Sequence, residues 1–109
     1  MARVREAAAA ASRFQLTSAQ IQARSEVRMA QEEVRGTELA LDSIRLAAQH
    51  AQDVLNITNT AFQAGATTNL EVIDAQRSAR ESQAAAAIGE DAVRRARLEL
   101  LIALGRFPQ

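Results

Sequence analysis

The 109-residue sequence predicts an all-α fold, a long antiparallel helical hairpin (a coiled coil) with arms of unequal length. Apolar residues return every seven positions over long stretches, which is the spacing of a coiled-coil seam. A glycine interrupts this pattern in the middle of the chain and another near its end, where the single proline also lies. No alternating apolar and polar run bounded by turns indicates a β-strand.

The composition favours closely packed helices over a compact globule. Apolar residues make up 48 % of the chain, but many are alanine and only 3 % of residues are aromatic. With 13 basic and 13 acidic residues the formal net charge is zero, which argues against a nucleic-acid partner because such proteins present a basic face. No cysteine is present, so disulfides are excluded. No apolar stretch has the length of a membrane span, and we expect no direct insertion of this segment into a membrane.

Gly65 marks the turn of the hairpin. It follows the last periodic residues of the first half, where a glycine can adopt a positive φ and close a helix as its C′ residue. Thr68 and Glu71 then match a capping box, in which the Thr68 hydroxyl accepts from the Glu71 N–H and the Glu71 side chain returns to the Thr68 N–H. Because the loop is short, the two helices are expected to be antiparallel neighbours.

These signals predict a single domain, 1–109. We expect it to consist of a helix at 3–64, a tip turn at 65–68 and a helix at 68–104. Gly105, followed by Pro108, is expected to end the second helix. The first arm is longer, so the stretch before Ala30 lacks an intrachain partner. An isolated helix gains little stability without packing, and we expect self-association, as a dimer or a trimer.

The heptad rows also predict how the helices pack. Phe62 is expected to face Val72, and small residues to lie opposite large ones in the middle of the seam. Gly36 and Gly89 are interpreted as packing glycines. A second, weaker apolar row runs along the first helix at Leu39, Ala40, Leu46, Ala47, Val54 and Ala61. The main seam residues are Val34, Leu41, Leu55, Val72, Val93 and Leu100.

No residue constellation typical of an enzyme occurs. His50 is the only histidine, and no second nitrogen or sulfur donor could complete a metal site with it. Nucleotide-binding, nucleophile-elbow and zinc-protease motifs are missing from the sequence. We therefore expect no catalytic residue, no metal and no cofactor. Glu71 and Asp74 lie one turn apart just after the tip, either as acids that favour a helix N-terminus or as a functional pair.

The segment around the turn resembles a known family. Residues 62–77 (FQAGATTNLEVIDAQR) are similar to the tip signature of TolC-type outer-membrane efflux proteins. That signature runs aromatic, two residues, glycine, a few polar residues, then an acid, two aliphatic residues and Asp-Ala-Gln. Ala96 with residues 100–105 (LLIALG) resembles the pattern that closes the family's helical repeat.

The resemblance implies that the chain is the second-repeat periplasmic hairpin of a larger channel protein for efflux or type I secretion. It would face the periplasm, below the outer membrane of a Gram-negative cell, and form part of the exit duct of a trimer. A periplasmic adaptor would dock at the tip, and an inner-membrane transporter would be an indirect partner.

The aperture acids of the family would map onto Glu71 and Asp74, and its tip onto Phe62, Gly65, Thr67 and Thr68. Some members latch the closed tip with a tyrosine and an arginine, where this chain has Phe62 and Thr67. Two other interpretations stay open. The chain could be the α-hairpin of a periplasmic adaptor, although the usual adaptor tip pattern is not found at 62–76, or a generic coiled-coil interaction module.

Overall fold

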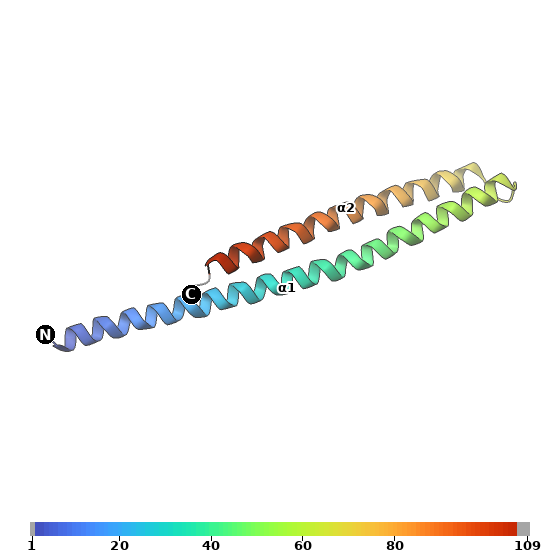
Figure 1. Cartoon of the computed structure of the whole chain (residues 1–109). Helices are drawn as coiled ribbons and strands as arrows, with labels where there is room; N and C mark the ends of the chain where they lie inside the picture. Colours follow the sequence, from blue (N-terminus) through green and yellow to red (C-terminus); the bar gives the residue numbers. More distant parts are fainter. Residues whose placement is uncertain (1, 107–109) are drawn as a thin grey trace. The chain divides into compact units, whose positions relative to one another are not determined.

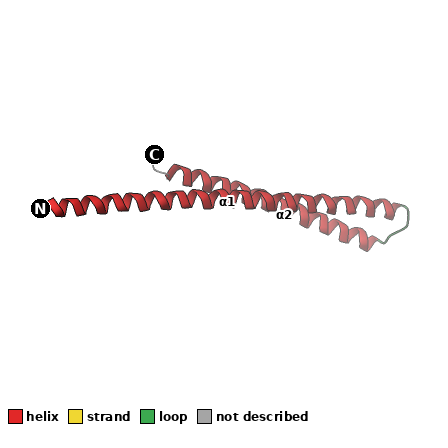
Figure 2. Ribbon diagram, turned by 90° about the horizontal axis from the view of Figure 1, so that it is seen from below, coloured by secondary structure: helices red, strands yellow, loops and turns green. Residues whose placement is uncertain are grey.

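The computed structural model describes residues 2–106, and 95 % of these residues are helical. Helix α1 spans Ala2–Gln63 and helix α2 spans Asn69–Arg106. One turn joins them into a hairpin, and no strand occurs in the described residues (Figures 1 and 2). The all-α hairpin expected from the heptad rows is thereby confirmed. The helix ends lie one or two residues from the expected ones.

The prediction that Gly105 ends the second helix is wrong. Gly65 is the only described residue with a positive φ, and α2 continues through Gly105 to Arg106. Glycine adopts helical φ about as readily as left-handed φ, so a glycine by itself does not end a helix. Pro108, the other half of that predicted stop signal, lies outside the described residues.

The chain divides into two compact units. The tip unit is Arg35–Arg95 and contains the turn, and the arm unit consists of the residues up to Val34 and from Ala96 onward. The buried side chains of both units fall on the heptad rows. In the tip unit they are Leu41, Val72, Ala75, Ala79 and Val93, and in the arm unit Ala23, Ala96 and Ala103.

The remaining seam residues are less covered. Leu55 in the tip unit and Val34 and Leu100 in the arm unit are half-buried. No described side chain is less than 2 % exposed, so the core is thin. The arm before Ala23 leaves its large side chains exposed, namely Val4, Phe14, Leu16 and Ile21.

The two glycines interpreted as packing residues behave differently. A Cβ built on Gly89 would lie 3.1 Å from Leu41 Cδ1 and 3.3 Å from Ile44 Cδ1, so its missing side chain makes room for α1. A Cβ built on Gly36 would have nothing within 4 Å among residues 2–106. The interpretation of Gly36 as a packing glycine within the hairpin is therefore wrong, because it does not face α2 closely.

Candidate functional site

The turn that ends α1 has the two backbone hydrogen bonds of a Schellman motif. The Ala66 N–H donates to the Ala61 carbonyl over 2.8 Å, and the Gly65 N–H donates to the Phe62 carbonyl over 3.0 Å. Gly65 has a φ of 77°, in the left-handed region where glycine avoids the Cβ penalty. The motif satisfies two carbonyl groups that the last turn of α1 would otherwise leave unpaired.

Thr68 caps the start of α2. Its hydroxyl accepts a hydrogen bond from the Glu71 N–H over 3.3 Å, and its carbonyl accepts from the Val72 N–H, also over 3.3 Å. Within the described residues the return bond from the Thr68 N–H to the Glu71 carboxylate is not formed, so that half of the expected capping box is wrong. The Glu71 side chain is exposed, and hydration by water replaces the missing bond at little cost.

Glu71 and Asp74 lie on one side of the hairpin, close to the tip. Both are exposed, and both border a shallow groove of about 400 Å³ whose other walls include Val54 and Thr58 of α1 and Ser78 of α2. Neither carboxylate forms an ion pair within residues 2–106. The structure thus brings the two acids together beside the positive end of the α2 dipole.

Two other residues predicted at the tip, Phe62 and Thr67, also lie at the turn end of the hairpin. Phe62 is 45 % exposed because the seam ends at the turn. Thr67 is half-buried, and its hydroxyl oxygen is buried without a hydrogen-bond partner among the described residues. The burial of the Thr67 hydroxyl could not be predicted from the sequence, because it depends on the conformation of the turn and not on the residue type.

The two edges of the tip unit, where α1 and α2 meet, differ in chemistry. On the polar edge Arg45 Nη2 lies 3.2 Å from Glu90 Oε1, and one heptad along each helix Gln83 donates to Gln52 over 3.3 Å. Heptad spacing places small or apolar residues on the other edge, here called the apolar edge. They are Ala40, Ala47, Val54 and Ala61 of α1 with Ser78, Ala85 and Ala92 of α2.

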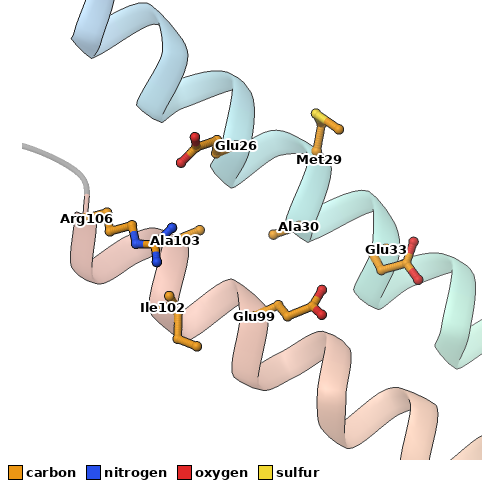
Figure 3. A pocket seen from close by; sticks show the side chains of 8 residues that line it. All are labelled: Glu26, Met29, Ala30, Glu33, Glu99, Ile102, Ala103 and Arg106. Carbon is orange, nitrogen blue, oxygen red and sulfur yellow. The ribbon is translucent and has the colours of Figure 1, made fainter.

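The arm unit has a groove of its own, of about 500 Å³, which Figure 3 shows from close by. Four charged residues border it, Glu26 and Glu33 from α1 and Glu99 and Arg106 from α2. Their seven-residue steps along each helix could have indicated this cluster from the sequence. Even so, no group of three or more carboxylate, histidine or cysteine side chains in residues 2–106 is arranged to hold a metal ion.

His50 is exposed on α1 and belongs to no such group. Neither described helix combines the length and apolarity needed to cross a membrane. Neither a family model, nor a curated protein, nor a solved structure matches the chain. The features that bear on function are therefore the tip, the two edges and the resemblance of residues 62–77.

Proposed function

We propose that the chain is a periplasmic wall segment of an outer-membrane channel for efflux or type I secretion. The proposal rests on the conformation of the tip and on the two acids exposed there. A Schellman turn and a threonine cap hold it in one conformation, and Glu71 and Asp74 are exposed on one side of it. The sequence of this same segment resembles the TolC-type tip signature.

In such a channel the hairpins of several copies would stand side by side, with their tips at the periplasmic end. Carboxylates arranged as a ring at a constriction attract cations and repel anions. Glu71 and Asp74 would supply that ring, and the channel would open when the tips move apart. The tip would also be the docking surface for a periplasmic adaptor, through which the channel would meet an inner-membrane transporter.

The uncovered apolar surface supports this arrangement. A hairpin that worked alone would gain nothing from exposed leucine and isoleucine side chains, yet Leu39, Leu46 and Ile57 are each at least 60 % exposed. A wall segment needs neighbours beyond its own second helix, and such neighbours would cover these side chains.

Single-channel conductance of the full-length gene product in planar bilayers tests the proposal. We expect Glu71→Gln combined with Asp74→Asn to lower the preference for cations and to weaken block by multivalent cations. The matched control is Glu81→Gln combined with Asp91→Asn, which removes the same charge from α2 away from the tip. Unchanged selectivity in the tip variant, or an equal change in the control, would refute the aperture role. Absence of any channel would refute the proposed function.

A further inference from the structure

The acids at the tip lie on the same side of the hairpin as the apolar edge. Glu71 and Asp74 share the groove of about 400 Å³ with Val54 and Ser78, which are both members of that edge. Glu71 also precedes Ser78 by one heptad, so it begins the row that continues through the α2 members of the edge. The two acids and the apolar edge therefore form one continuous surface of the tip unit.

The polar edge lies across the seam from this surface. Its two links between the helices, Arg45 with Glu90 and Gln83 with Gln52, involve neither of the tip acids. In an antiparallel pair of helices the residues that flank the seam form two edges, one on each side of the buried rows. Buried side chains of the tip unit, such as Leu41, separate these edges. The apolar edge and the polar edge therefore face in opposite directions.

Exposed aliphatic side chains mark the remaining two sides of the tip unit. On α1, Leu46 is 60 % exposed and lies five residues after Leu41 of the seam, roughly 140° around the helix axis at 3.6 residues per turn. On α2, Ile88 is 71 % exposed and lies five residues before Val93 of the seam. Each helix thus has an apolar face directed away from the other helix. Neighbours that cover both faces would stand in line with α1 and α2, and the two edges would face the two sides of such a wall.

We propose that the apolar edge lines the duct of the channel and that the polar edge faces away from the duct. This inference rests on the proposed function, because it takes Glu71 and Asp74 to face the duct at its aperture. The groove that these acids share with Val54 and Ser78 then brings the apolar edge to the duct side as well. The reverse orientation would turn both carboxylates away from the duct, where they could form no ring at a constriction.

This orientation predicts a charge-free section of wall directly above the aperture. From Ala61 to Ala40 the α1 row of the apolar edge contains no charged residue, over a length of roughly 30 Å at 1.5 Å per residue. The α2 row is equally uncharged from Ser78 to Ala92. Within the tip unit, the preference for cations would therefore come from the two acids and not from this section of the wall. A polar edge on the duct side would instead place an arginine–glutamate pair along the path of the cargo.

Reaction of single cysteines with a positively charged methanethiosulfonate tests which edge lines the duct. The reagent is added to channels of the full-length gene product in planar bilayers, after any other cysteine of that product has been replaced by serine. Ser78→Cys on the apolar edge should lose current when the bulky cation attaches to it. Gln83→Cys on the polar edge should keep its current. Both positions are exposed on α2, so neither is shielded by the hairpin itself.

A charge inserted on each edge gives a second measurement that needs no chemical modification. Ala47→Arg on the apolar edge would add a basic ring to the duct and should lower the preference for cations, because such rings favour anions. Gln52→Arg places the same charge on the polar edge of α1 and should leave the preference unchanged. Neither residue is buried, so circular dichroism of the chain should report equal helicity for both variants.

The outcomes separate this inference from the function on which it rests. Loss of current from Gln83→Cys, or from neither cysteine variant, would overturn the orientation even though a channel forms. An equal change in selectivity for Gln52→Arg and Ala47→Arg would overturn it too. Absence of any channel would refute the proposed function, and the inference with it. The proposal requires loss of current from Ser78→Cys alone and a change in selectivity from Ala47→Arg alone.

Discussion

Replacing Gly36 and Gly89 with alanine, one at a time, separates helix propensity from packing. Both lie inside helices, where alanine is favoured over glycine by about 1 kcal/mol. At Gly36 no described residue lies within 4 Å of the new Cβ, so the full gain should appear. We expect Gly36→Ala to raise the free energy of unfolding by about 1 kcal/mol, or the melting temperature by about 4 °C.

Gly89→Ala has the same propensity gain but meets α1. Its Cβ would lie 3.1 Å from Leu41 Cδ1 and 3.3 Å from Ile44 Cδ1, so both side-chain ends must move by a few tenths of an ångström. Overpacking of this kind costs about 1–3 kcal/mol. The net change should therefore fall between about zero and a loss of about 2 kcal/mol.

Urea unfolding followed by circular dichroism gives both values, at a protein concentration where the midpoint no longer depends on concentration. Equal m-values would show that both variants unfold from equally compact states. Gly105→Ala is a useful control, since it also has open space around its Cβ. If Gly89→Ala stabilises as much as Gly36→Ala, Leu41 and Ile44 do not pack on Gly89, and the register described for the tip unit fails.

Three further variants test the turn and the polar edge with the same melts. Gly65→Ala forces alanine to a φ of 77° and should cost about 1–2 kcal/mol, with Gly65→Asn costing less; no loss would contradict the left-handed turn. Thr68→Ala removes the cap and should cost about 1 kcal/mol, whereas Thr68→Ser should retain it; equal melts for the two would contradict the cap. A double-mutant cycle on Arg45 and Glu90 should give a coupling below about 1 kcal/mol that 1 M salt removes, because the pair is exposed; a larger, salt-insensitive coupling would contradict this.

The turn could be predicted because its signals are local. A glycine after a periodic stretch and a threonine three residues before a glutamate need no knowledge of the other helix, and the structure has both the Gly65 turn and the Thr68 cap. Gly105 shows the limit of the same signal. In sequence, a glycine that ends a helix and a glycine that continues one look alike. Only the local hydrogen bonding and φ distinguish them.

Contacts between the helices were harder to predict. Glu90 has Arg94 one turn along its own helix, but it pairs with Arg45 of α1, while Asp91 pairs with Arg95. Which arginine each acid pairs with depends on the edge of the seam where the acid lies. That edge can be known only once the alignment of the two helices is known. The Gly36 error has a different cause, since its heptad position, two residues after Val34 of the seam, already places it on the side of α1 away from α2.

Three features fix this register, namely the turn, Gly89 and the polar edge, and the position of the tip acids depends on it. The Schellman turn sets the number of residues between the helices, so α2 begins at a defined height beside α1. Thirty ångströms further along, at about 1.5 Å per residue, Gly89 lies where Leu41 and Ile44 leave no room for a side chain. A slip of one heptad would keep the apolar rows matched but bring Ser82 or Ala96 to that place and separate Arg45 from Glu90. The apolar rows alone therefore permit several alignments of the two helices. Gly89 and the polar edge select the alignment that holds Glu71 and Asp74 at the tip.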